Sequence, residues 1–299
     1  MQYPDWLDRN EYPFAAHTLE VEGGRMHYVD EGDGPPVVMV HGTPTWSFLY
    51  RHLIKDISRN YRCIAMDHLG FGLSDKPAGW SYRAADHARN VAALIERLGL
   101  KDLTLVAHDF GGSIGLSYAI DHPENVSRMV LFNTWMWPFD DPTALRVGKL
   151  MGSPIGKLLY TRLNFSPRVI VKGAWGDKRT LTPALHRHYT AVHPTPQDRY
   201  GMWMLAREVV EAAPWWQSLW DRRDRIADIP ALLLWGMRDP AIKPDNLARW
   251  QGCLNDAQTI TFPATGHFVP EEQPAAVGAA VGEFLAQHAG SAALARSAA

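Results

Sequence analysis

Residues 103 to 113 have the pattern of a strand that turns sharply into a helix. The run LTLVAHDFGGS begins with apolar residues, and helically spaced apolar residues follow its two glycines. A strand and a helix can meet so tightly only if the flanking residues are small, as Ala107 and Gly111 are. Asp109 occupies the tip of this turn. Its carboxylate could cap the following helix, or it could displace a leaving group from a tetrahedral carbon and form an alkyl ester.

The segment His41-Gly42-Thr43-Pro44 follows an apolar strand pattern that ends at Val40. In folds with this kind of turn, a loop after an early strand supplies one backbone N–H of an oxyanion hole, and the residue after the nucleophile supplies the other. We therefore expect the amides of Thr43 and Phe110 to form an oxyanion hole beside Asp109.

Two further loops carry an acid and a base. Asp239 follows the apolar run 231–235, and His267 follows the predicted strand 258–262. The chain order Asp109, Asp239, His267 is the order of nucleophile, acid and base in such folds. Together with the predicted oxyanion hole, this order favours a triad of Asp109, His267 and Asp239.

Strand and helix patterns alternate along most of the chain, which predicts a mostly parallel, eight-stranded sheet with helices on both faces, an α/β fold. The regularity lapses after residue 133 in a stretch rich in Trp, Tyr, Pro and Arg, with helical periodicity over 144–159 and 184–192. An insertion here would fall at the carboxyl edge of the sheet, over Asp109. We expect a core of residues 1–134 and 229–288, a helical cap of residues 135–228 and a flexible tail of residues 289–299.

Composition limits the possible partners. The 299-residue chain has a net charge of −2 and no basic stripe, which argues against nucleic acid. No apolar run of about 18 residues is present to span a membrane, and the N-terminus lacks a secretory signal, so we expect no membrane partner and a cytoplasmic protein. His186 and His188 have no third ligand at a recognisable spacing, so we expect no metal and no cofactor.

Six motifs together resemble the haloalkane dehalogenases, most of all their third subfamily. They are HGTPTWSFLYR (41–51), DHLGFGLSDKP (67–77), AHDFGG (107–112), NTWMWP (133–138), WGMRDP (235–240) and GHFVPEEQP (266–274). The resemblance covers about residues 14 to 288. It implies an α/β-hydrolase fold with an inserted helical cap, and the triad named above. It also implies hydrolysis of a carbon–halogen bond to an alcohol and halide, with water as co-substrate. The aromatic and methionine residues of the cap suit a small, uncharged, apolar substrate.

The sequence departs from this family at two positions. Dehalogenases with an HG-N-P-T segment hold the departing halide with that Asn and with a Trp directly after the nucleophile; Thr43 and Phe110 stand there in this chain. Phe has no side-chain donor, and a Thr hydroxyl has a shorter reach. Removing one such donor costs roughly 3 kcal/mol, about a hundredfold in rate, so weak dehalogenation is expected unless Trp135 or Trp137 supplies an indole N–H.

Three other functions remain open at this point. Epoxide hydrolases share the Asp-His-Asp set but need two cap tyrosines, for which Tyr160, Tyr189 and Tyr200 are candidates. Relatives of the third subfamily include β-lactone decarboxylases with the same aspartate nucleophile. A non-catalytic ligand-binding protein on a hydrolase scaffold is the alternative of another class. The sequence leaves the oligomeric state undetermined.

Overall fold

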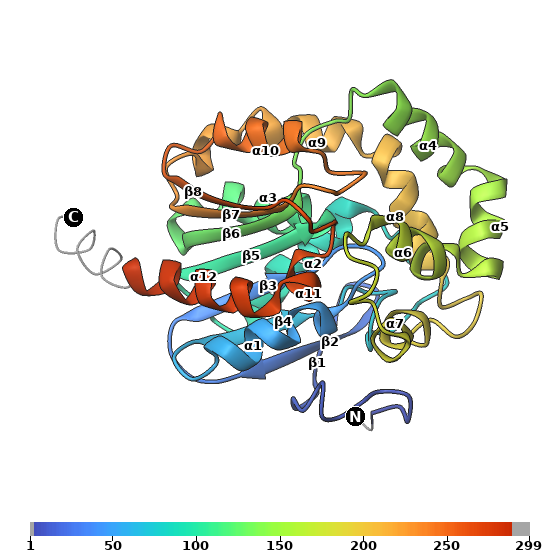
Figure 1. The fold of residues 1–299 in the computed structure, drawn as a ribbon, viewed down its shortest axis with the longest axis horizontal. Helices are drawn as coiled ribbons and strands as arrows, with labels where there is room; N and C mark the ends of the chain where they lie inside the picture. Colours follow the sequence, from blue (N-terminus) through green and yellow to red (C-terminus); the bar gives the residue numbers. More distant parts are fainter. Residues whose placement is uncertain (1–2, 289–299) are drawn as a thin grey trace.

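One sheet of eight strands, in the order β1-β2-β4-β3-β5-β6-β7-β8, forms the centre of the protein (Figure 1). The structure is a computed structural model that describes residues 3–288. The strands are β1 (His17–Val21), β2 (Gly24–Glu31), β3 (Pro36–Val40), β4 (Arg62–Met66), β5 (Leu103–Asp109), β6 (Val126–Thr134), β7 (Ala231–Gly236) and β8 (Ala257–Phe262).

Helices connect these strands. They are α1 (Arg51–Ile57), α2 (Ala84–Arg97), α3 (Phe110–Asp121), α4 (Pro142–Gly152), α5 (Pro154–Leu163), α6 (Val171–Ala174), α7 (Pro183–Thr190), α8 (Tyr200–Glu211), α9 (Ala213–Trp220), α10 (Pro244–Gln251), α11 (Val269–Glu272) and α12 (Pro274–Gln287). Short helical turns are η1 (Ser47–Tyr50), η2 (Pro123–Asn125), η3 (Ser166–Ile170) and η4 (Arg223–Ile226).

The sheet is mostly parallel, as predicted. β2 runs antiparallel to both β1 and β4, and every other neighbouring pair is parallel. The β1–β2 hairpin turns at Gly23 and Gly24, whose φ angles of 102° and 152° favour glycine. Because parallel strands end at one edge of a sheet, the loops after β3, β5, β7 and β8 come together there.

Alternate residues of the central strands face two separate apolar cores. On β5, Leu105 and Ala107 pack with α2 and α3, whereas Val106 packs with α1 and α12 on the other side. The strands therefore read as continuous apolar runs, because both faces of the sheet are covered. This two-sided packing fixes the strand ends, and with them the loops at the carboxyl edge.

Helices α4 to α9 form a single insertion between β6 and β7, beyond the carboxyl ends of the parallel strands (Figure 1). A backbone hydrogen bond of 2.8 Å from the His267 amide to the Ala174 carbonyl joins this insertion to the loop after β8. No helix in the described part of the chain is long and apolar enough to cross a membrane. The predicted tail, residues 289–299, lies outside the described residues.

The helical periodicity over 144–159 is divided between two helices, α4 and α5. Pro154 has no N–H and holds Ser153 in an extended conformation (φ −74°, ψ 171°), so α4 cannot continue through it. The Ser153 hydroxyl then accepts a hydrogen bond of 3.3 Å from the Gly156 amide and caps α5. A Ser-Pro pair inside a periodic run was the signal for this break.

Candidate active site

Asp109 stands at a strained turn between β5 and α3. Its φ of 55° and ψ of −130° are unusual for a residue with a side chain. The Thr134 hydroxyl donates a 2.5 Å hydrogen bond to the Asp109 carbonyl oxygen. A Cβ at Gly111 would lie 2.0 Å from the Val40 carbonyl oxygen, so glycine is required there. The Asp109 side chain makes no capping hydrogen bond to the second or third residue of α3, so it does not act as the helix cap that the alternative expected.

Two backbone amides instead point at the Asp109 carboxylate. The Thr43 amide donates to Oδ2 over 2.8 Å, and the Phe110 amide also hydrogen-bonds the carboxylate. A Cβ at Gly42 would lie 2.2 Å from Oδ2, so the carboxylate can approach this loop only because residue 42 is glycine. Burial raises the pKa of Asp109 to about 6, although His267 and the two amides act in the opposite direction.

His267 lies between the two carboxylates. Its Nδ1 is 2.6 Å from Asp239 Oδ2, and its Nε2 is 3.7 Å from Asp109 Oδ1. The contact with Asp239 fixes the ring so that Nε2 faces Asp109. Burial by itself would lower the pKa of His267, but the charge and hydrogen bond of Asp239, with the charge of Asp109, raise it to about 9. The structure therefore brings the three residues of the predicted triad together.

Sequence reasoning missed the residues that hold Asp239. Asn133, at the end of β6, donates to Asp239 Oδ2 over 3.0 Å and exchanges hydrogen bonds with Gly236. The amides of Ala241 and Ile242 donate to Oδ1 over 2.8 and 3.0 Å. A buried polar residue at the carboxyl end of a parallel strand was the available signal for Asn133.

Glu272 holds the loop that carries His267. Its Oε1 accepts from the Gly266 amide over 3.0 Å, and its Oε2 accepts from the amides of Gly176 and Asp177 over 2.8 and 3.2 Å. The same carboxylate thus ties the insertion to the His267 loop. No spacing in the sequence connects residues 176 and 272, so this role was not predictable.

The two candidate tryptophans lie in different places. The Trp135 ring meets the Phe110 ring edge-on, with centroids 4.8 Å apart, and meets Trp216 at 5.7 Å. The Trp137 ring packs against Trp220 at 5.0 Å instead. The structure therefore brings Trp135, and not Trp137, next to the residue that follows Asp109.

Three buried donors around this cluster have no hydrogen-bond partner within residues 3–288. They are Thr43 Oγ1, Trp135 Nε1 and Trp216 Nε1. Most buried polar atoms in proteins are paired, and an unpaired one costs about 1–3 kcal/mol. Unpaired donors beside a buried carboxylate suit an anionic ligand.

The three candidate tyrosines do not form a pair at Asp109. Burial, with the Asp109 charge adding to it, raises the pKa of Tyr160, whose hydroxyl is hydrogen-bonded with Ser166. The Tyr189 hydroxyl donates to Glu271. The Tyr200 ring packs against Trp203 with centroids 5.4 Å apart.

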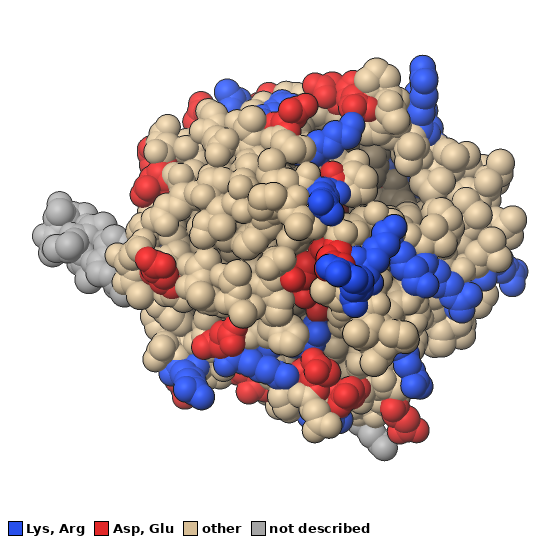
Figure 2. Space-filling model, in the orientation of Figure 1, with Lys and Arg blue, Asp and Glu red and all other residues tan. Residues whose placement is uncertain are grey.

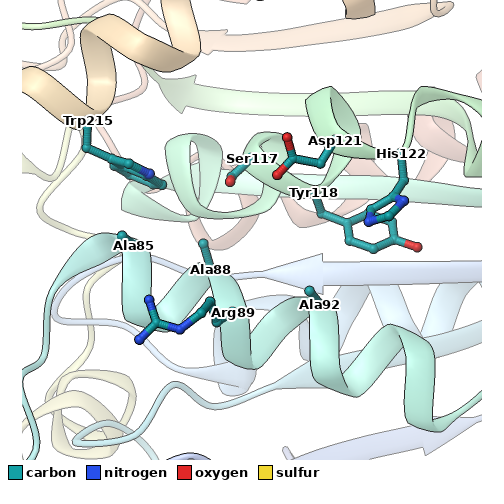
Figure 3. A pocket seen from close by; sticks show the side chains of 9 residues that line it. All are labelled: Ala85, Ala88, Arg89, Ala92, Ser117, Tyr118, Asp121, His122 and Trp215. Atoms are coloured by element: carbon teal, nitrogen blue, oxygen red, sulfur yellow. The ribbon is translucent and has the colours of Figure 1, made fainter.

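A cavity of about 240 Å³ lies away from Asp109, between α2 and α3 (Figure 3). Trp215 lines one end of it, and Tyr118 and His122 line the other. Its charged lining groups are already paired: Arg89 with Asp86 at 2.7 Å, and Asp121 with Arg222 at 2.6 Å. None of the candidate site residues lines this cavity.

Comparison with known proteins agrees with this geometry. The sequence model of the α/β hydrolase fold matches residues 35–154 and 183–274. Haloalkane dehalogenase 2 of Mycobacterium tuberculosis is 35% identical over 278 residues, which are 92% of this chain and 96% of that protein. A cis-3-alkyl-4-alkyloxetan-2-one decarboxylase of Xanthomonas campestris is 32% identical over 294 residues, covering 92% of this chain and 97% of that protein.

Solved structures show the same relationship. The crystal structure of the haloalkane dehalogenase DbeA from Bradyrhizobium elkanii superposes with a TM-score of 0.84 at 27% identity, and the match covers 93% of this chain and 99% of that one. Sequence and structure together assign the chain to the haloalkane dehalogenase family of α/β hydrolases.

Proposed function

We propose that this protein is a haloalkane dehalogenase that works through an alkyl ester on Asp109. The observation that carries the proposal is the placement of the Asp109 carboxylate, held by the amides of Thr43 and Phe110 and faced by the His267 ring. A carboxylate attacks a tetrahedral carbon, whereas a serine in this place would attack a carbonyl. The arrangement therefore suits an alkyl halide.

In the first step, a carboxylate oxygen of Asp109 attacks the carbon, the carbon–halogen bond breaks, and halide leaves with the bonding electron pair. This step needs no base, because a carboxylate with a pKa of about 6 is already ionised at neutral pH. The 3.7 Å separation of His267 Nε2 from Asp109 Oδ1 fits this division of labour, since it is longer than a hydrogen bond.

In the second step, His267 Nε2 takes a proton from water, and the hydroxide adds to the ester carbonyl of Asp109. The amides of Thr43 and Phe110 then hold the developing oxyanion. Its collapse breaks the bond to the alkyl oxygen, and the departing alkoxide takes the proton from His267 Nε2 and leaves as the alcohol. The carboxyl group that remains loses its proton to solvent, which regenerates the Asp109 carboxylate. Ester formation also removes the Asp109 charge, which is one of the causes that raise the pKa of His267. His267 thus becomes a better base at the stage where a neutral ring is needed.

Trp135 Nε1 and Thr43 Oγ1 are the halide donors in this proposal. Both atoms are buried without a partner in the described chain, and both residues lie beside Asp109 or Phe110. They replace the Asn and Trp donors that the sequence lacks. Trp137, the other candidate, contacts Trp220 and stays outside this arrangement.

The insertion acts as the cap in this proposal, with residues 135–228 as its bounds. The Phe110, Trp135 and Trp216 rings meet where it joins the core. Such a lining excludes water from the first step and suits a small, uncharged, apolar substrate.

The second candidate function is β-lactone processing. It is favoured by the 32% identity to an oxetanone decarboxylase over nearly the whole chain. Epoxide opening has less support, because the Tyr189 hydroxyl donates to Glu271 instead of facing Asp109, and no second tyrosine pairs with Tyr160 there.

The test is bromide and chloride release from a panel of bromo- and chloroalkanes. Styrene oxide and a cis-3,4-dialkyl β-lactone are followed in parallel, and Asp109→Ala is the control. Bromide release that disappears in Asp109→Ala is the expected result. If no haloalkane releases halide and the lactone or the epoxide is consumed, the site would be assigned to that substrate instead.

A further inference from the structure

Exposed large apolar side chains are concentrated in one part of the insertion. Six of the seven in residues 3–288 lie on α4, on α5 and in the segment that follows α5, and they are 48% to 61% exposed. They are Val147, Leu150, Ile155, Leu158, Leu163 and Val169. Single exposed apolar residues are ordinary, but a cluster of this kind marks an interaction surface.

The packing of α4 explains why these side chains point outward. Its inner face carries glycine: a Cβ at Gly148 would lie 3.0 Å from Val210 and 3.1 Å from Val209 of α8, and Gly152 faces Arg207. The small residues Gly148 and Gly152 let α4 approach α8 closely, and Met151 packs against the core on this side. Val147 and Leu150 remain on the outer face, 53% and 48% exposed.

Basic residues are frequent in the same stretch of the chain. The stretch 142–176 contains no Asp or Glu in a chain whose net charge is −2. Its six basic residues are exposed, and none of them forms an ion pair in the described structure. They are Arg146, Lys149, Lys157, Arg162, Arg168 and Lys172. Figure 2 shows basic but no acidic side chains over α5, at the right-hand edge of the molecule.

We propose that this surface, the α4–α5 face (these six apolar and six basic residues), docks on an anionic lipid membrane. The apolar side chains would enter the boundary between headgroups and acyl chains, and the basic ones would contact lipid phosphates. A spanning helix is not required. The expectation of no membrane partner rested on the absence of a spanning run and of a secretory signal, and neither bears on docking at the membrane surface.

Charge and shape favour lipid over the other occupants. Two copies of the chain joined through this face would bring two sets of six unpaired cations together, which repel each other. Nucleic acid would satisfy the charges but would leave Ile155 and Leu158 against a polar backbone. An anionic bilayer matches both the charge and the apolar character of this face. It would also concentrate apolar alkyl compounds near the protein, and this advantage alone rests on the proposed function.

Vesicle flotation tests the proposal with the whole protein. The vesicles are phosphatidylcholine alone and phosphatidylcholine mixed with phosphatidylglycerol. We expect binding to the anionic vesicles at least about tenfold stronger than to the neutral ones. Binding should fall when salt shortens the screening length from about 10 Å at 0.1 M to about 3 Å at 1 M. Equal binding to both vesicles, or none at low salt, would overturn the proposal.

Two sets of variants locate the surface. Arg146→Gln/Lys149→Gln/Arg162→Gln should weaken binding to anionic vesicles about a hundredfold. The matched control, Arg59→Gln/Arg97→Gln/Lys101→Gln, removes the same charge at the opposite edge of the sheet and should change binding by no more than about threefold. A control that weakens binding as much as the first triple would contradict the assignment to this face.

The apolar part is tested by Leu150→Ser/Ile155→Ser/Leu158→Ser, which should reduce binding even at low salt. These positions are exposed, so circular dichroism should show an unchanged fold. Light scattering that finds a dimer, made monomeric by this variant, would assign the face to a second copy and overturn the proposal. Asp109→Ala should bind vesicles like the wild type, so failure of the catalytic proposal leaves this result interpretable.

Discussion

The two sides of His267 differ in how completely their polar atoms are paired. On one side, the Asp239 carboxylate accepts four hydrogen bonds, from the amides of Ala241 and Ile242, from Asn133 and from His267 itself. These partners are all part of the folded chain. The hydrogen bonds of Asp239 are therefore complete without a ligand, and they hold the His267 ring in one orientation.

On the other side, around Asp109 and Phe110, Thr43 Oγ1, Trp135 Nε1 and Trp216 Nε1 are buried and unpaired within residues 3–288. Each costs stability in the resting protein. Under the proposed function, the His267 ring is held in place before substrate arrives, and the unpaired donors around Asp109 gain a partner only when a halide anion forms. The proposal therefore places the cost in stability on the side where the leaving group would bind.

The largest effect on the reaction rate should come from Asp239→Asn, which disrupts the fully paired contacts of Asp239. This change removes the charge that raises the pKa of His267 and places an amide NH₂ among donors. We expect hydrolysis of the ester to fall about 10³- to 10⁴-fold, as for the equivalent change in a serine protease. Rapid mixing should still show a burst of halide, because the first step needs no base. The control is Asp245→Asn, which changes an exposed carboxylate on α10 and should leave both the burst and the later steady rate unchanged. Loss of the halide burst in Asp239→Asn would show that Asp239 is also needed for ester formation.

Around Asp109, where donors are unpaired, Trp135→Phe should slow halide release about a hundredfold, because losing one donor to the departing halide costs about 3 kcal/mol. Trp137→Phe is the matched control, since both rings are buried and lose the same N–H. Added bromide should raise the melting temperature of the wild type and of Trp137→Phe, but not of Trp135→Phe. Equal rates for the two variants would show that Trp135 donates nothing.

The pH dependence of the rates should distinguish ester formation from ester hydrolysis. Since Asp109 has a pKa of about 6 and must be ionised to attack, ester formation should fall about tenfold per pH unit below pH 6. Ester hydrolysis depends on neutral His267, and its midpoint should lie below the value of about 9 that holds while Asp109 is charged. Single-turnover rates of halide and alcohol release between pH 4 and about 10 measure both. Ester formation that stays constant down to pH 4 would be incompatible with this account.

The smallest effect is expected for Thr43→Val, which keeps the backbone amide and removes only the hydroxyl. A neutral donor to an anion contributes about 1.5 kcal/mol at the low end, so halide release should slow about tenfold. Thr43→Ser keeps the hydroxyl and should stay close to the wild-type rate. Equal losses in both variants would point to the backbone of this loop rather than the hydroxyl.

The strand ends were predictable because their signals are local. The turn at Asp109 shows in eleven consecutive residues, and Asp239 and His267 each follow a recognisable strand. Parallel strands bring such ends to one edge, so proximity follows from topology without any knowledge of side-chain packing. The mostly parallel sheet and the hairpin at Gly23 were confirmed for the same reason.

The partners of these residues were not predictable, because they depend on packing between distant segments. Asn133 reaches Asp239 across 106 residues of sequence, and Glu272 reaches the Gly176 amide across 96. Trp135 and Trp137 look equivalent in the sequence, yet only Trp135 packs on Phe110. The exposure of Val147 and Leu150 on α4 was not predictable either, because it depends on the close packing of Gly148 against α8.

In the proposed reaction, Asp109 carries the alkyl group between the two steps. The most direct test is intact mass of His267→Phe after incubation with 1-bromohexane, followed by peptide mapping. We predict one hexyl group on the peptide that contains Asp109, and none in His267→Phe/Asp109→Ala. Bromide release without any adduct, or an adduct that persists in the double variant, would exclude an alkyl ester on Asp109.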